Sequence, residues 1–305
     1  MLLKIYYSLK PFIPRRVQLS LRRIIAKRKL QKIKESWPIC PGSEKIPKYF
    51  KAWPEGRFAL ALTHDVDTQR GHDRVKELMK LEMELGFRSS FNFVPERYNV
   101  SIDLIDELKA NSFEIGVHGL VHDGRLYESK EIFLKRAKKI NFYLKEWNAV
   151  GFRSPAMHHN LDWIHDLDIL YDSSTFDTDP FEPQNDGVNT IFPFWVENPR
   201  NPSSGYVEMP YTLPQDHNLF IILQMKDISI WKKKLDWIVE NGGMALLNCH
   251  PDYMYFGHGE RSIEDYSASL YEDFLRFVKA KYSHCMWHPL PREMANFWKS
   301  IASGD

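Results

Sequence analysis

Side chains that could do chemistry follow apolar stretches of strand length at four places in this sequence. The residues at these places are Asp65 and Asp67, His118 and His122, Arg153, and His250. In parallel α/β proteins, the side chains at the carboxyl ends of the strands gather at one edge of the sheet. We therefore expect these six side chains to lie near one another.

The two histidines of the second place are spaced as metal ligands. His118 and His122 are four residues apart, so both imidazoles can face one point if the second begins a helical turn. Zinc and similar divalent ions take imidazole ligands, and a carboxylate from Asp67 would complete a set of three. Three protein ligands leave positions open for water and a carbonyl oxygen, which distinguishes a catalytic metal site from a structural one. The pattern predicts a divalent metal cofactor, with Zn²⁺ as the expected ion, and hydrolysis as its natural use.

The elements that would position these residues alternate between apolar strands and amphipathic helices. Helices are expected at 73–85, from 101, at 129–147 and at 227–241, and strands at 58–63, 90–94, 113–117, 150–152 and 244–249. Repeated βα units imply a parallel sheet, either open or rolled into a barrel. Residues 175–225 break this rhythm with many Pro, Asn, Asp and aromatic residues, and we expect a loop-rich insertion there.

The order of the motifs resembles that of the polysaccharide deacetylase (NodB homology) family, also called carbohydrate esterase family four, over about residues 57–290. The resemblance implies the fold class: α/β, an irregular (β/α) barrel of about seven strands. The family's commonest first motif has two adjacent aspartates followed by glycine, whereas here Val66 separates Asp65 from Asp67. This Asp-x-Asp spacing is typical of a divergent branch.

The resemblance also implies a role for each candidate residue. Asp67, His118 and His122 would bind the metal, and Asp65 would be the general base, held by the arginine of Arg153-Ser-Pro155. The histidine of Leu247-Asn-Cys-His250 would be the general acid. Asp172 occupies the place of the fourth motif and would orient His250, with Asp177 and Asp179 as competing candidates.

These roles are chemically consistent with hydrolysis of an amide. A carbonyl next to a divalent cation is polarised, Asp65 can remove a proton from the attacking water, and His250 can protonate the departing amine. Arg153 beside Asp65 would favour the ionised carboxylate. The expected function is removal of an N-acyl group, with acetyl as the expected one, from a sugar used in surface-glycan biosynthesis.

Two alternative functions compete with this interpretation. An Asp-x-Asp pair also holds the metal-diphosphate of a nucleotide sugar in glycosyltransferases. Here, however, the pair follows the first strand, and nothing upstream except a basic segment could bind a nucleotide. A catalytically degenerate protein that binds a glycan without cleaving it is the second alternative.

The first 35 residues differ in charge from the rest of the chain. They contain eleven Lys or Arg residues and one acidic residue, whereas residues 36–305 sum to a net charge of about −9. Residues 15–34 mix basic and apolar side chains in a pattern compatible with an amphipathic helix, which could lie on an anionic membrane or pack on the body. We therefore expect a basic N-terminal extension and linker at 1–50 and a catalytic domain at 51–305.

Cysteine usage and the N-terminal sequence indicate the compartment. Cys40, Cys249 and Cys285 are too few and too scattered for a disulfide framework, which favours a reducing environment. The sequence begins without the apolar core of a signal peptide, so we expect a cytoplasmic protein, peripheral on the inner face of the membrane if residues 1–35 bind it. The expected partner is an N-acylated sugar, free or linked to a nucleotide or lipid, and no nucleic acid.

Overall fold

Regular βα units form the first part of the body. The computed structural model describes residues 14–33, 35–182, 184 and 186–302. The units comprise β1 (Phe58–Val66), α3 (Gln69–Leu85), β2 (Ser90–Phe93), α4 (Ile102–Ala110), β3 (Glu114–His118), α5 (Lys130–Glu146) and β4 (Gly151–Arg153). The predicted strands and helices of this part are therefore confirmed, and α3 begins one turn earlier than expected. Ser101 caps α4 by accepting a hydrogen bond from Leu104 N, and Gly86 ends α3 in the left-handed conformation.

The second part is less regular. After β4 come η2 (Pro155–Met157), α6 (Leu161–Ile164), β5 (Tyr171–Asp172), the antiparallel pair β6 (Phe194–Asn198) and β7 (Asn201–Glu208), and η3 (His217–Ile222). The chain then returns to longer elements with α7 (Ser229–Glu240) and β8 (Met244–Cys249). It ends with η4 (Pro251–Tyr253), β9 (Met254–Tyr255), β10 (Tyr266–Ser267), α8 (Ser269–Tyr282), β11 (Met286–Trp287) and α9 (Pro291–Ala302).

The strands form a parallel ring that closes irregularly. Within the described residues, neighbouring parallel strands follow the order β8, β1, β2, β3, β4, β5, β7. The ring closes where Leu213, on the segment after β7, forms a parallel bridge with Leu247 of β8. Thr212 and Leu213 both donate backbone hydrogen bonds to Leu246 O at 3.1 Å. This confirms the predicted irregular barrel of about seven strands.

The structure of the segment 175–225 differs from the prediction made from the sequence. It was expected to be a loop-rich insertion outside the βα rhythm, but it contains β7 and the closing segment of the barrel. β7 pairs in parallel with β5 on one side and antiparallel with β6 on the other. A segment that alternates short strands with polar turns can thus complete a barrel without an apolar run of ordinary length.

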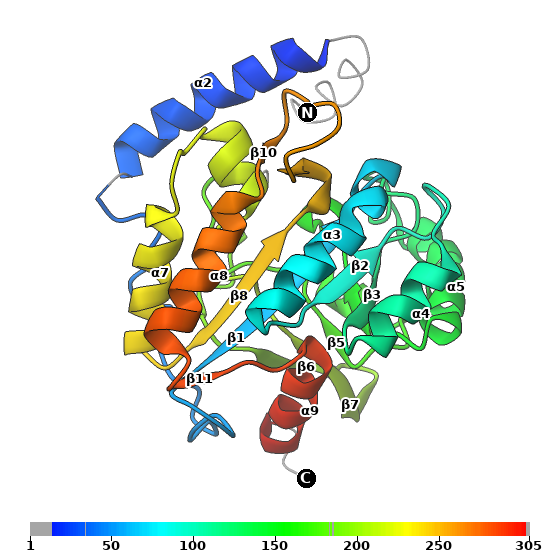
Figure 1. The fold of residues 1–305 in the computed structure, drawn as a ribbon. Helices are drawn as coiled ribbons and strands as arrows, with labels where there is room; N and C mark the ends of the chain where they lie inside the picture. The colour runs from blue at the N-terminus through cyan, green and yellow to red at the C-terminus, as the bar shows by residue number, and fades with distance from the viewer. Residues whose placement is uncertain (1–13, 34, 183, 185, 303–305) are drawn as a thin grey trace.

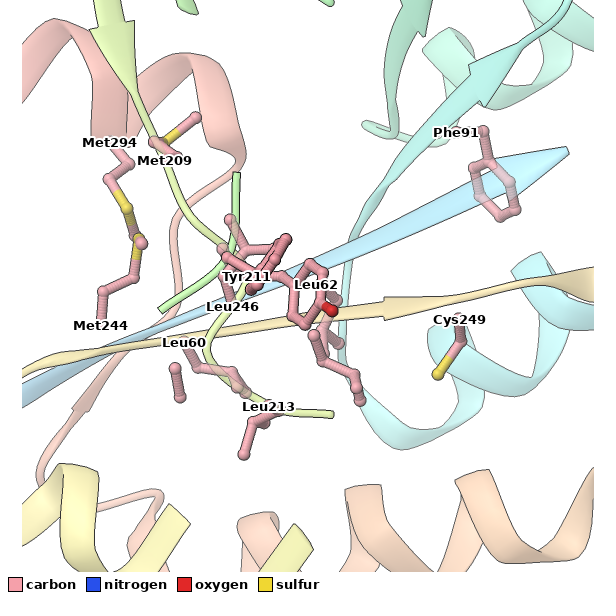
Figure 2. Close-up of a cluster of buried hydrophobic side chains, with 14 of the residues drawn as sticks. Leu60, Leu62, Phe91, Met209, Tyr211, Leu213, Met244, Leu246, Cys249 and Met294 are labelled. Carbon is pink, nitrogen blue, oxygen red and sulfur yellow. The ribbon is translucent and has the colours of Figure 1, made fainter. Parts of the chain in front are cut away.

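The core lies on both sides of β1, which is buried along its whole length. Figure 2 shows Leu60 and Leu62 of β1 beside Leu246 of β8 and beside Tyr211 and Leu213 of the closing segment. All five are at most 1% exposed. Burying a leucine side chain contributes about 1.5–3 kcal/mol, so this contact stabilises the closure of the ring.

The basic N-terminal segment forms a helix that packs on the body. Helix α2 (Arg15–Ile33) buries Leu19 and Ala26, and Arg23 Nε donates to Ile221 O of η3 at 2.9 Å. Figure 1 shows α2 lying across the end of the molecule toward which the arrow of β8 points. Residues 1–13 of the predicted basic extension lie outside the described residues, and the domain division at residue 50 stays a prediction. Among the helices of the described residues, none is long and apolar enough to cross a membrane.

Candidate metal centre

The site begins at the carboxyl end of β1. Side chains two residues apart in a strand point to the same side, so Asp65 and the residue just beyond the strand, Asp67, leave β1 together. β2 and β8 flank β1 and end beside it, with Asp65 in register with Asn92, and His64 with Cys249. Parallel register therefore brings residues from distant parts of the chain to the two aspartates.

Asp67, His118 and His122 converge as predicted. Asp67 Oδ1 lies 3.3 Å from His118 Nε2 and 3.1 Å from His122 Nε2. The three candidate ligand atoms all lie within 4.8 Å of one another. This spacing matches atoms that share one cation, because metal bonds of about 2.0–2.2 Å place neighbouring ligand atoms roughly 3–4 Å apart.

A turn, and not a helix, brings the two imidazoles together. The sequence analysis considered a helical turn that begins at His122, but the chain after His118 reverses through Gly119, at φ 63°, and His122 itself has φ 53°. A Cβ atom at residue 119 would lie 2.5 Å from Pro155 Cγ, so glycine is needed both for its conformation and for this close approach. The result is the same pairing of ligands by a different backbone path, with ring centroids 5.1 Å apart.

The donor set fits a divalent transition metal ion. His118 Nδ1 donates to the carbonyl oxygen of Arg153 at 3.0 Å, which leaves Nε2 as the free nitrogen facing Asp67. Asp67 Oδ1 is buried and has no hydrogen-bond partner among the described residues, although the two imidazole nitrogens lie close to it. A buried acceptor without a donor is costly, and a cation held between the carboxylate and the imidazoles would satisfy it.

Asp252 holds the backbone at the first aspartates. Its Oδ2 accepts a hydrogen bond from Asp67 N at 2.9 Å, and its Oδ1 accepts one from Thr68 Oγ1 at 2.5 Å. Gly71 on α3 is packed so closely against this carboxylate that a Cβ atom there would lie 2.1 Å from Oδ2. Asp252 therefore orients the loop that presents Asp67.

Asp65 is held differently from Asp67. Its Oδ1 accepts hydrogen bonds from Arg153 Nη1 at 3.1 Å and Asn92 Nδ2 at 2.9 Å, and its Oδ2 accepts one from Asn248 Nδ2 at 2.8 Å. Burial alone would raise the pKa of Asp65, but the charges of Arg153 and the neighbouring imidazoles outweigh it and hold the pKa below its usual value. Asp65 is therefore an ionised carboxylate across the neutral pH range.

Arg153 is a buried cation, and all three nitrogens of its guanidinium donate hydrogen bonds. Besides Asp65, it donates from Nε to Ser173 O at 2.7 Å, from Nη1 to Thr63 Oγ1 at 2.9 Å and from Nη2 to Ser173 Oγ at 2.7 Å. The planar fork of arginine suits this fixed arrangement, which a lysine could not reproduce. The side chain thus ties β1, β4 and the end of β5 to one another.

His250 pairs with Asp216, which the sequence analysis did not name. Asp216 Oδ1 lies 2.7 Å from His250 Nδ1, and Asp216 Oδ2 accepts from His250 N at 2.8 Å and from Tyr266 Oη at 3.0 Å. Burial alone would lower the pKa of His250, but the Asp216 carboxylate outweighs it and raises the pKa to about 10. The imidazole is therefore charged at neutral pH, with Nε2 turned toward Asp65 Oδ2 at 4.0 Å.

The three aspartates expected to orient His250 lie elsewhere. Asp172 accepts hydrogen bonds from Ser174 Oγ and Ser174 N, Asp177 forms an ion pair with Lys234, and Asp179 accepts from Tyr211 Oη and Asn218 Nδ2. The assignment of Asp172 to this role was wrong, because Asp172 bonds to Ser174 and the carboxylate beside His250 is that of Asp216. Ser174 Oγ accepts a hydrogen bond from Ser154 N at 2.8 Å, so Asp172 is connected through Ser174 to the residue after Arg153.

In this site the Asp65 carboxylate lies between the candidate metal ligands and the charged His250. Asp65 Oδ2 lies 3.9 Å from His118 Nε2 in the candidate metal trio and 4.0 Å from the charged His250. A small pocket beside His122 is lined by residues that include Leu120, Tyr127, Pro155 and His158. The arrangement offers a base, a proton donor and a cation site within reach of one small bound group.

Sequence reasoning missed four residues of this site. Asn92 and Asn248 lie in strands that were predicted, but an amide at a strand end gave no sign of a role, and neither did Asp252. Asp216 had only a weak signal. The polar residues Gln215 and Asp216 follow the short run Tyr211-Thr-Leu-Pro214, which is less apolar than the stretch before Asp65.

Comparison with known proteins identifies the fold. No protein-family model matches the sequence, and no curated protein matches it significantly. Solved structures match well. A Mycobacterium smegmatis protein named as a polysaccharide deacetylase matches with a TM-score of 0.65 at 17% identity, over 84% of this chain and 95% of its own. The PuuE allantoinase matches with a TM-score of 0.64 at 16% identity, over 87% and 98%.

A third structure supports the same assignment. A probable polysaccharide deacetylase from Pseudomonas aeruginosa PAO1 matches with a TM-score of 0.59 at 16% identity, over 87% of this chain and 96% of its own. The chain therefore has the irregular barrel fold of the polysaccharide deacetylases, a fold that an allantoinase shares. Within the described residues it has one three-residue candidate site for a metal ion, at the carboxyl end of the barrel strands.

Proposed function

We propose that this protein is a metal-dependent deacetylase that removes an N-acyl group, with acetyl as the expected one, from a sugar. The observation that supports it best is the placement of Asp65 between the trio Asp67, His118, His122 and the charged His250. Two of the structures that share the fold are named as polysaccharide deacetylases.

The proposed chemistry divides the work among the residues. Asp67, His118 and His122 would hold the ion, Zn²⁺ in our proposal, which when bound supplies Lewis acidity toward a carbonyl group and water. Asp65 accepts a proton from the attacking water as the new C–O bond forms. His250 donates its Nε2 proton to the leaving nitrogen as the C–N bond breaks, and the products are a carboxylate and an amine.

The surrounding residues keep both groups in the required state. Arg153, Asn92 and Asn248 hold Asp65 ionised and immobile, so that it accepts a proton without becoming a fourth ligand. Asp216 holds the tautomer and orientation of His250 and stabilises its charged form, as in other carboxylate–histidine pairs.

The structure argues against the glycosyltransferase alternative. In that alternative, Asp65 and Asp67 would jointly hold one metal-diphosphate. Instead, Asp65 is engaged by a buried arginine and two asparagines, and Asp67 faces two imidazoles. The separate environments of the two carboxylates support separate roles in the proposed reaction.

We further propose a role in assembling a surface glycan within a reducing compartment. All three cysteines are free, which is consistent with such a compartment. The sugar that is deacylated would be an intermediate, linked to a nucleotide or to a lipid.

The test is metal content together with release of acetate. We expect about one zinc per chain in the purified protein and acetate release from N-acetylated sugars such as N-acetylglucosamine oligomers. His122→Ala should lose both. His258→Ala is the matched control, because His258 is 70% exposed and pairs with Glu77 on the surface. Metal binding without acetate release would favour the glycan-binding alternative. UDP-sugar binding that is equally tight in the wild type and in His122→Ala would favour the glycosyltransferase.

A further inference from the structure

Helix α2 has two apolar faces, and only one of them is used for packing. Leu19 and Ala26 are 1% and 6% exposed and face the body. Val17, Leu21, Ile24 and Ile25 lie on the opposite face and are 47%, 51%, 49% and 66% exposed. Packing against the body therefore explains half of the apolar side chains of this helix and leaves the other half uncovered by the described residues.

The exposed side chains form one stripe. Positions four, seven and eight residues after Val17 lie on the same side of an α-helix, so the four side chains are neighbours. Ten large apolar side chains are exposed among the described residues, and four of them are in this stripe. Single exposed apolar residues are ordinary, but a contiguous stripe marks an interaction surface.

The charges around the stripe indicate what it contacts. Arg16, Lys27, Arg28 and Lys32 are exposed on α2, and the helix contains no acidic residue. The remainder of the chain, 36–305, is negatively charged. An anionic lipid surface would attract the helix and repel the body, which orients the protein with α2 toward the membrane. A symmetric contact with a second copy would instead place two basic helices against each other.

The helix lies at the end of the molecule that contains the site. Its inner face packs on η3, which begins directly after Asp216, the residue that holds His250. Arg15 forms an ion pair with Glu264 in the segment between β9 and β10, so α2 also contacts the loops after β8. Figure 1 shows the same arrangement, with α2 close to the β10 region.

We propose that the outer face of α2 docks on an anionic membrane, with Val17, Leu21, Ile24 and Ile25 inserted among the lipids, and that it presents the site to N-acylated sugars on lipid carriers. The identity of the substrate in this inference rests on the proposed function, whereas the docking itself does not. A helix binds at a membrane interface by burying an apolar face at the headgroup boundary, with basic side chains around that face.

Vesicle flotation of the full chain tests the docking. We expect the wild type to float with vesicles containing phosphatidylglycerol and to bind phosphatidylcholine vesicles much less. The double variant L21Q/I25Q should reduce partitioning by roughly tenfold or more, because two apolar side chains no longer insert. R28Q/K32Q should reduce it by roughly thirtyfold at low salt, from about 1 kcal/mol per basic residue near the surface. I102Q/F142Q is the matched control, since Ile102 and Phe142 are also exposed but lie on α4 and α5.

Several outcomes would overturn the docking. The first is a wild type that does not bind anionic vesicles. The second is a folded L21Q/I25Q variant that binds them as tightly as the wild type does. The third is a wild-type protein that is dimeric in solution while L21Q/I25Q is monomeric. Circular dichroism and thermal unfolding of each variant establish that it is folded. Exposed positions are chosen so that the packed face of α2 stays intact.

The substrate is tested separately. L21Q/I25Q should release acetate from a soluble N-acetylated sugar as fast as the wild type. On an N-acetylglucosaminyl lipid in anionic vesicles it should be at least roughly tenfold slower, in proportion to its lost binding. Equal rates on the lipid would overturn presentation of lipid-linked substrates. If the wild type binds vesicles but releases no acetate from either substrate, the proposed function fails and the docking stands.

Discussion

The two parts of the barrel supply their site residues in different ways. In the part from β1 to β4, each functional side chain lies at the end of a strand or within a few residues of it, as with Asp67, His118 and Arg153. In the part from 175 to 225, Asp216 follows an irregular closing segment that leaves β7 and bridges β8. Strand register positions the candidate metal trio, whereas a long-range contact positions the partner of His250.

The difference shows which site features depend on local pattern. A parallel strand brings its last residues to a known edge, so a polar residue there can be located from sequence alone. Asp216 reaches His250 only because Leu213 bridges Leu247 and sets the path of the chain after it. Replacing residues in each part should therefore separate the two kinds of contribution.

The largest expected effect distinguishes Asp216 from Asp172. Asp216→Asn should lower kcat for acetate release on the order of 10²–10⁴-fold, because the amide cannot hold or charge-stabilise His250 as the carboxylate does. It should also lower the pKa of His250 from about 10, measured by NMR titration of the imidazole. Asp172→Asn should leave kcat and that pKa near their wild-type values.

One result for Asp172→Asn would contradict this prediction. If Asp172→Asn reduced kcat as much as Asp216→Asn while both proteins remained folded, the division between the two parts of the barrel would be wrong. A change in thermal stability alone for Asp172→Asn would agree with its buried contacts to Ser174.

Two buried ion pairs allow a second comparison. Arg153 pairs with Asp65 in the site, and Lys234 pairs with Asp177 outside it, with all four side chains at most 3% exposed. Removing one partner of a buried pair costs about 3–5 kcal/mol of unfolding free energy, because the other charge stays buried. Arg153→Met should therefore lower stability in urea denaturation and abolish acetate release.

Lys234→Met is the matched variant outside the site. It should lower the unfolding free energy as well, but the protein that remains folded should keep the wild-type kcat. If the folded variant had a lower kcat than the wild type, Asp177 or Lys234 would have a catalytic role that the geometry does not assign.

A smaller effect is expected from pH at the opposite end of β3. Burial raises the pKa of Glu114 to about 7, although Arg292 and Tyr171 partly oppose it. The native state then keeps a proton that the unfolded state loses near pH 4.5, so stability should fall as the pH rises from about 4.5 to about 7 and then level off. The expected total is about 3 kcal/mol.

Glu114→Gln tests this assignment. Gln carries no charge, so the part of the pH dependence that comes from Glu114 should disappear from unfolding curves measured between pH 4.5 and pH 7. An unchanged pH dependence in the variant would show that another buried carboxylate is responsible.

Most of the regular part could be predicted from sequence. The strand β1 was located because a continuous apolar run predicts a strand buried on both faces, and β2, β3, β4 and β8 were located as short apolar segments that alternate with amphipathic helices. The positions of Asp65, Asp67, His118, His122, Arg153 and His250 followed from those strands. The turn through Gly119 was not predicted, since four-residue spacing suits a helix and a tight turn equally well.

Residue types and spacing within the sequence determined the βα rhythm, the strand ends and the candidate ligands, because these depend on neighbours within a few residues. Tertiary structure alone decided that β7 completes the barrel, that Asp216 and not Asp172 meets His250, and that one face of α2 packs while the other stays exposed. These three features depend on contacts between segments that are far apart in the sequence. A periodic pattern indicates that a helix face is apolar, but it does not indicate which segment covers that face.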